Sequence, residues 1–156
     1  QNISKNLSRS FDQLCTRKIL LRFRKSVLIM NQEKIKIPIQ SKNEIVLMVD
    51  TFYDKVKKDT LIGPIFTDTA KVNWEEHLPK LYNFWEDLLL GTDNYKGRPF
   101  PPHIHLNLKL EHFERWLSLF FDTVDENFTG LKANEAKERA LRIAKNFSVN
   151  LGLSKF

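Results

Sequence analysis

Residues 112–124 read HFERWLSLFFDTV, and their apolar side chains recur at intervals of three and four residues. The apolar positions are Phe113, Trp116, Leu117, Phe120, Phe121 and Val124. This spacing lines the side chains along one face of an α-helix, so it predicts an amphipathic helix whose apolar face enters a core. Most of these side chains are aromatic, which indicates a core rich in rings.

Two earlier segments predict helices by the same criterion. The stripe of the first consists of Ile45, Met48, Val49, Phe52, Tyr53 and Val56. Ser41 and Glu44 precede it with the spacing of a capping box, which marks the start of a helix. The second helix is expected from about Trp74 to Leu90, and Gly91 suits its C-terminal end. One side of it carries His77, Leu81, Phe84, Trp85 and Leu88.

Pro79 conflicts with the second helix, because proline lacks a backbone donor and disfavours the α conformation in the residue before it. Two alternatives are open. Either the helix begins near Leu78 and residues 74–77 form a separate turn, or the helix kinks at Pro79.

A fourth helix is expected from about Ala133 to Leu151, after Gly130. Its inward positions are Ala136, Ala140, Ile143, Ala144, Phe147 and Leu151. No segment shows the alternation of apolar and polar residues that is typical of a strand. The sequence therefore predicts an all-α fold.

Residues 91–102, here called the arm, read GTDNYKGRPFPP. Its three prolines remove backbone donors and stiffen the chain, so the arm is not expected to form a regular helix. A simple four-helix bundle uses short loops, whereas a long irregular segment is more often functional. The arm leads directly to His103, and His105 follows two residues later.

Composition indicates a single globular domain. The chain has 156 residues, of which 42% are apolar and 28% charged. The whole net charge of +6 falls within residues 1–29, so the remaining residues are neutral and offer no field for nucleic acid. Cys15 is the only cysteine, and no apolar run reaches the length of a membrane helix. We expect a soluble, cytoplasmic protein with neither nucleic acid nor membrane as a partner.

The basic leader, residues 1–29, differs sharply from the domain expected over residues 30–156. The first methionine is Met30, so the leader is interpreted as translated upstream sequence that does not fold and is not native. An organelle-type presequence and a basic surface-binding helix are the alternatives.

Four histidines are the candidates for chemistry: His77, His103, His105 and His112. A zinc site is the weaker interpretation, because paired-ligand motifs are absent and residues 30–156 contain no cysteine. The glycine-flanked serine of hydrolases and a phosphate-binding glycine loop are absent as well. One imidazole on a stiff segment, facing aromatic helix faces, suits a haem iron. Plain core packing of the aromatic residues is the alternative.

Nearly all of residues 41–150 resembles the group III truncated haemoglobins. The matching blocks are TFYDKV (51–56), LIGPIF (61–66), WEEHLPKLYNFW (74–85), LLG (89–91), YKGRP (95–99), the segment at His103, and HFERWL (112–117). The resemblance implies a two-over-two helical sandwich around haem b. It also implies that His103 is the proximal ligand of a pentacoordinate iron, with His105 as the competing assignment and His112 as a structural residue.

The same resemblance implies a distal side opposite His103. Tyr53 is expected to donate a hydrogen bond to the bound ligand, as is the Trp116 indole, which can only donate. His77 is expected to act as a gate, although an exposed surface histidine is the alternative. The other expected cofactor contacts are Phe52, Phe66, Leu81 and Trp85.

Two hydrogen-bond donors would make ligand binding tight. Charge-assisted hydrogen bonds contribute about 1.5 to 3 kcal/mol each, so two could slow O₂ release by roughly 100-fold or more. Such a protein suits nitric oxide or peroxide chemistry better than O₂ transport, and CO would also bind. Turnover would require a separate reductase, so catalysis stays open. The alternatives are a module that binds or senses O₂ or nitric oxide without turnover, and a haem-free helical interaction domain.

Overall fold

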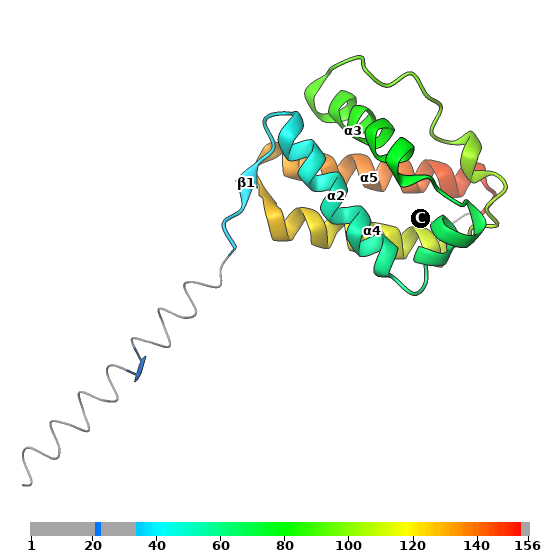
Figure 1. The fold of residues 1–156 in the computed structure, drawn as a ribbon, viewed down its shortest axis with the longest axis horizontal. Helices are drawn as coiled ribbons and strands as arrows, with labels where there is room; N and C mark the ends of the chain where they lie inside the picture. The colour runs from blue at the N-terminus through cyan, green and yellow to red at the C-terminus, as the bar shows by residue number, and fades with distance from the viewer. Residues whose placement is uncertain (1–20, 23–33, 154–156) are drawn as a thin grey trace, which may run out of the picture. The chain divides into compact units, whose positions relative to one another are not determined.

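Four long helices dominate the computed structural model, which describes residues 21–22 and 34–153 of the chain. They are α2 (Lys42–Lys58), α3 (Trp74–Leu90), α4 (Leu110–Asn127) and α5 (Leu131–Asn150) (Figure 1). The all-α prediction is confirmed. Apart from residues 21 and 22, the leader predicted over residues 1–29 lies outside the described residues.

The helices form two packed pairs within the unit of residues 36–156. Helix α2 packs against α3 and α4, α4 packs against α5, and α3 also contacts α5. The arm leaves the end of α3, runs back past that helix and reaches the C-terminal part of α5 (Figure 1). This arrangement is a two-over-two sandwich. Within residues 21–22 and 34–153, no helix combines the length and hydropathy needed to cross a bilayer.

Short elements complete the fold, and the sequence did not indicate them. Strand β1 (Ile37–Pro38) pairs in parallel with β2 (Phe128–Thr129), so the expectation of no strand is wrong. Two residues are too few for an alternating pattern to emerge. A π-helix, η1 (Ile65–Thr69), follows α2, and a 3-10 turn, η2 (Pro101–His103), closes the arm.

The start of α2 follows its sequence signature. The Ser41 hydroxyl accepts from the Asn43 backbone N–H at 3.3 Å, and Glu44 Oε2 accepts from the Ser41 backbone N–H at 2.6 Å. Hydrogen bonds with Ser41 lower the pKa of Glu44 below its ordinary value. The predicted capping box is confirmed.

Helix α3 begins at Trp74, so the alternative of a start near Leu78 is wrong. The His77 backbone N–H donates to the Asn73 carbonyl at 2.9 Å, as in a regular first turn. Pro79 is the sixth residue of the helix and lies beyond its first turn, so the hydrogen bond that a backbone N–H there would donate to the Glu75 carbonyl is lost. Gly91 ends α3 with a φ of 73°, a conformation that favours glycine.

The core contains a stack of three aromatic rings. The Trp85 and Phe120 ring centroids lie 4.8 Å apart with planes inclined by 17°, and those of Phe120 and Trp116 lie 5.6 Å apart with planes inclined by 10°. Phe52, which is fully buried, meets both Phe120 and Trp116 edge-on. Helix α5 approaches this core through small buried residues: Ala133, Ala136, Ala140 and Ala144. The stack joins α3 to α4 by ring contacts that tolerate little displacement.

A buried carboxylate ties the end of α2 to α4. Asp59 Oδ1 accepts from the backbone N–H groups of Leu61 and Ile62, both at 3.0 Å, and Oδ2 accepts from Arg115 Nε at 2.7 Å. Burial acts to raise the pKa of Asp59, but the hydrogen bonds from Ile62, Arg115 and Leu61 outweigh it, so the pKa lies below its ordinary value of 3.8.

We expect Asp59→Asn to lower the free energy of unfolding by about 2 kcal/mol, because asparagine cannot form the charged pair with Arg115. Since the folded-state pKa is lowered, the stabilisation by Asp59 is complete above pH 3.8 and is lost as the pH falls toward the folded-state value. Urea unfolding at pH 7 and pH 3 measures both effects. Asp54→Asn, at an exposed carboxylate 3.7 Å from Lys57, is the control and should change little. Equal losses for the two variants at pH 7 would contradict the assignment.

Candidate functional site

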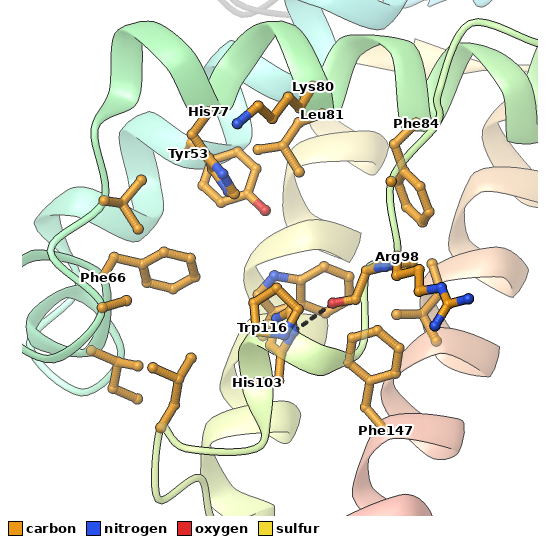
Figure 2. Close-up of a pocket in the computed structure, with 18 of the residues that line it drawn as sticks. Tyr53, Phe66, His77, Lys80, Leu81, Phe84, Arg98, His103, Trp116 and Phe147 are labelled. Atoms are coloured by element: carbon orange, nitrogen blue, oxygen red, sulfur yellow. Dashed lines mark hydrogen bonds between the residues drawn. The ribbon is translucent and has the colours of Figure 1, made fainter.

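A cavity of about 1010 Å³ opens between the helices, η1 and the arm. This volume lies at the upper end of the roughly 300–1,000 Å³ of small-molecule pockets. Its apolar lining includes Ile62, Ile65, Phe66, Leu81, Phe84, Trp85, Phe113, Trp116, Ile143 and Phe147. Figure 2 shows Tyr53, His77 and Leu81 on one side of the cavity and His103 and Phe147 on the other.

Tyr53 is a donor that stays protonated. Its side chain is 5% exposed and lines the cavity from α2. Burial raises the pKa of Tyr53 far above its ordinary value, and a hydrogen bond with the Trp116 side chain offsets this only in part. Because an indole N–H can only donate, the phenol oxygen accepts from Trp116 and keeps its own hydrogen for another acceptor.

A cluster of aromatic rings surrounds Tyr53 at the end of the cavity formed by η1. The Phe66 ring lies 5.9 Å from that of Tyr53 and stacks on Trp74, with centroids 5.8 Å apart. Trp74 also lies 6.1 Å from the His77 ring, and Lys57 Nζ is 4.6 Å from the Trp74 centroid. Trp74 therefore holds the residues on this side in place, a contribution that the sequence analysis did not assign to it.

His77 is half-buried on α3 and lines the cavity. Its ring lies 6.4 Å from that of Tyr53. Burial lowers the pKa of His77, and the positive charge of Lys80 acts in the same direction. The imidazole is therefore neutral at pH 7 and can donate one hydrogen bond and accept another.

His103 directly follows the arm, and one of its ring nitrogens makes a hydrogen bond. Its Nδ1 lies 2.8 Å from the Pro99 carbonyl oxygen, which can only accept, so Nδ1 carries the hydrogen. The Nε2 lone pair is then available to a metal ion. Burial lowers the pKa of His103, which also favours the neutral form. The ring packs 4.9 Å from Phe147 of α5.

The other two histidines of this region differ from His103. His105 lines the cavity but is exposed, and His112 Nδ1 accepts from the Lys109 backbone N–H at 3.0 Å at the start of α4. Within residues 21–22 and 34–153, no group of three or more histidine, cysteine and carboxylate side chains is placed to hold a metal ion. The zinc alternative therefore has no ligand set in this part of the chain.

Trp85 and Phe52 were both expected to contact the cofactor, but only Trp85 lines the cavity. Trp85 lines the cavity, with its ring stacked on Phe120 behind it. Phe52 does not line the cavity, and it lies in the core behind Tyr53 and Trp116, with its ring 4.7 Å from that of Tyr53. Phe52 supports the cavity wall and does not form part of its surface.

Cationic side chains gather at the rim. Lys71, Lys80, Lys96 and Arg98 line the cavity, and Glu76 is the only carboxylate among its described lining residues. Lys96 pairs with Asp93 at 2.6 Å, whereas the other three form no ion pair within the described part of the chain. Lys80 lies on the helix that carries His77, and Arg98 lies on the arm (Figure 2).

Neither these cations nor Phe84 and Phe147 were predicted from the sequence to lie at the site. Phe84 follows His77 by seven residues and Leu81 by three, so the helical stripe already contained the signal. Phe147 belongs to the predicted inward face of α5. The cations leave no such signal, because lysine and arginine on exposed positions are common on any surface.

The sequence model of the bacterial-like globin family matches residues 38–150. The chain belongs to this family. It is 35% identical over 117 residues to the group 3 truncated haemoglobin ctb of Campylobacter jejuni, and the match covers 72% of this chain and 92% of the relative. The resemblance to group III truncated haemoglobins is thereby confirmed.

Two further comparisons place this globin. It is 32% identical over 68 residues to the group 1 truncated haemoglobin GlbN of Nostoc commune, a match that covers 43% of this chain and 55% of the relative. The crystal structure of the Campylobacter jejuni group III truncated haemoglobin superposes with a TM-score of 0.69 at 34% identity, covering 75% of this chain and 95% of the other. The two-over-two fold is therefore that of a truncated globin.

Membership of the globin family implies a haem cofactor and the binding of diatomic gases. The residues of the cavity fit such a group. Haem requires a large apolar slot, a neutral imidazole with one free nitrogen, and uncharged donors on the opposite side. The apolar lining, His103 and Tyr53 meet these requirements in turn, and the cations at the rim suit the carboxylates at the edge of the macrocycle.

Proposed function

We propose that this globin binds O₂ and other diatomic ligands tightly and serves nitric oxide or peroxide chemistry instead of O₂ transport. One observation carries the proposal. A neutral imidazole with an engaged Nδ1 and a phenol that burial keeps protonated lie on opposite sides of one apolar cavity.

His103 is the proposed proximal ligand, and the iron is proposed to be pentacoordinate in the absence of an external ligand. The hydrogen bond from Nδ1 to Pro99 fixes the tautomer and the ring plane, as is usual for histidine ligands. We propose non-covalent haem b as the cofactor, because the chain has one cysteine and lacks a Cys-x-x-Cys-His attachment motif. Lys71, Lys80 and Arg98 would hold its carboxylates.

When bound, haem would supply an iron centre that can take a diatomic ligand. The Tyr53 hydroxyl, which lies on the side of the cavity opposite His103, is proposed to donate to that ligand. The phenol is a stronger donor because it accepts from Trp116, since hydrogen bonds in a chain polarise one another. Trp116, which the resemblance implies as a second direct donor to the ligand, is therefore proposed to act through Tyr53. Leu81, Phe66 and Trp85 exclude water from around the ligand.

The chemistry on the bound ligand has two candidate outcomes. Conversion of nitric oxide and O₂ into nitrate consumes one electron, which a separate reductase would have to supply. The alternative is a module that binds or senses O₂ or nitric oxide without turnover.

The absorption spectrum of the purified protein, as isolated and after reduction under carbon monoxide, tests haem binding directly. A Soret band that shifts on adding carbon monoxide is expected, and a colourless protein after growth with hemin would overturn the proposal. Sustained consumption of nitric oxide with a flavin reductase and NADH would support catalysis. A single turnover followed by arrest would assign the protein to the binding module.

We expect His103→Ala to abolish haem retention, because it removes the only cavity imidazole held by a hydrogen bond to the arm. His105→Ala is the matched control and should retain haem, since that imidazole is exposed. The ratio of Soret to protein absorbance after gel filtration measures both. Haem loss from the His105 variant alone would transfer the ligand role to His105.

Tyr53→Phe should raise the O₂ dissociation rate by about tenfold, which corresponds to the loss of one hydrogen bond worth roughly 1.4 kcal/mol. Stopped-flow displacement of O₂ by carbon monoxide measures this rate. Tyr82→Phe removes a phenol that donates to Asp50 outside the cavity, so it should leave the rate unchanged. An unaltered rate in the Tyr53 variant would show that the phenol does not reach the ligand.

His77→Leu should change ligand entry more than ligand retention. Leucine cannot hold water in the entrance, so we expect carbon monoxide association to rise about threefold to tenfold, a change of roughly 1 kcal/mol. Flash photolysis gives the association rate. Tyr53→Phe should mainly change the dissociation rate, whereas His77→Leu should mainly change the association rate. A constant association rate in the His77 variant would exclude a gating role.

A further inference from the structure

Asp87, near the C-terminal end of α3, accepts hydrogen bonds from the first part of the arm. Oδ1 accepts from the Thr92 hydroxyl at 2.5 Å and from the Asn94 backbone N–H at 2.9 Å. Oδ2 accepts from the Tyr95 backbone N–H at 2.8 Å. Asp87 therefore uses both oxygens to satisfy donors that no regular element serves.

These bonds matter because few others hold this part of the arm: the Gly91 backbone N–H donates to the Asp87 carbonyl at 3.1 Å, and the Asn94 side chain donates to Glu86 Oε2 at 3.3 Å. Among the described residues, no backbone–backbone hydrogen bond starts or ends between Thr92 and Pro99. Without the carboxylate, the donors of Asn94 and Tyr95 would turn to solvent and the arm would gain conformational freedom.

A contact between Tyr95 and Phe84 holds the next part of the arm. The Tyr95 ring packs edge-on against Phe84 of α3, with centroids 5.2 Å apart. Tyr95 also folds back over Gly97, where a Cβ would overlap the phenol. The backbone at Gly97 is thus set by the ring that Asp87 and Phe84 hold in place.

The His103 imidazole directly follows the far end of the arm. Phe100 packs 5.2 Å from Phe147, and the His103 backbone N–H donates to the Phe100 carbonyl at 2.9 Å. Pro99, two residues beyond Gly97, supplies the carbonyl that accepts from His103 Nδ1. The Pro99 carbonyl therefore lies between two fixed points of the chain, the hydrogen bonds to Asp87 and the contact between Phe100 and Phe147.

We propose that Asp87 is a positioning residue for His103: by fixing residues 92–95 it holds the Pro99 carbonyl where the imidazole Nδ1–H can donate to it. Asp87 does not line the cavity. The part of this inference that concerns the iron rests on the proposed function of His103, whereas the part that concerns the hydrogen bond does not.

The test compares Asp87→Asn with Asp93→Asn in the full chain. Asparagine has one acceptor oxygen, so at least one donor of the arm loses its partner. Asp93 belongs to the same arm, but its carboxylate is 88% exposed and pairs only with exposed Lys96, so that variant is the matched control.

Amide hydrogen exchange gives the readout that does not need haem. In Asp87→Asn, exchange should accelerate by about tenfold at Asn94 and Tyr95 and also at His103, the far end of the arm. In Asp93→Asn it should not change at His103. Acceleration confined to residues 92–95 would overturn the proposal, because the anchorage would then be local.

Two readouts of the haem-loaded protein complete the test. The iron–histidine stretching frequency of the ferrous protein, which reports the hydrogen bond at Nδ1, should shift in Asp87→Asn, and hemin transfer to excess apomyoglobin should be about tenfold faster. Thr92→Ser should preserve both values and Thr92→Val should alter them in the direction of Asp87→Asn. An unchanged frequency with normal haem content overturns the positioning role, whereas absence of haem in the unaltered protein overturns the proposed function alone.

Discussion

The hydrogen bond between His103 Nδ1 and the Pro99 carbonyl is the constraint on which the chemistry of the cavity depends, and it joins the short 3-10 turn η2 to the irregular chain before it. In a long helix, repeated backbone hydrogen bonds would hold the residue that carries such a ring. Here prolines limit the backbone dihedrals, and contacts at the two ends of the arm remove most of the remaining freedom. Stiffness comes from covalent geometry and anchorage in place of repeated backbone hydrogen bonds.

The side of the cavity that carries Tyr53 is held in place by core packing. Tyr53 projects from a helix whose buried face enters the aromatic core, and the stack of Trp85, Phe120 and Trp116 supports it from behind. Close packing of rings resists displacement because every neighbour would lose contact at once. The donor side is thus part of the main core, while the imidazole side is attached to it through the arm and α5.

The helices and the capping box could be predicted from the sequence, because periodicity and short-range caps are local properties. The roles of neighbouring residues could not. Phe52 and Tyr53 both belong to the apolar stripe of α2, yet one enters the core and the other faces the cavity, a difference of about 100° around the helix that a broad stripe does not resolve. Pro79 was equally ambiguous, because a proline beyond the first turn either marks the end of a helix or is accommodated within it, and periodicity alone does not decide between the two. The strand pair, the rim cations and the anchorage at Asp87 depend on contacts made only after folding.

The distribution of charge explains why net charge was a poor guide to the partner. Residues 30–156 are neutral in sum, yet lysine and arginine gather at the rim of the cavity, where a single carboxylate accompanies them. Inside, burial keeps Tyr53 protonated and His77 and His103 neutral, so the polar groups that face the interior donate hydrogen bonds without carrying charge. An uncharged, apolar interior bounded by cations is the complement of a flat apolar macrocycle with anionic groups on one edge.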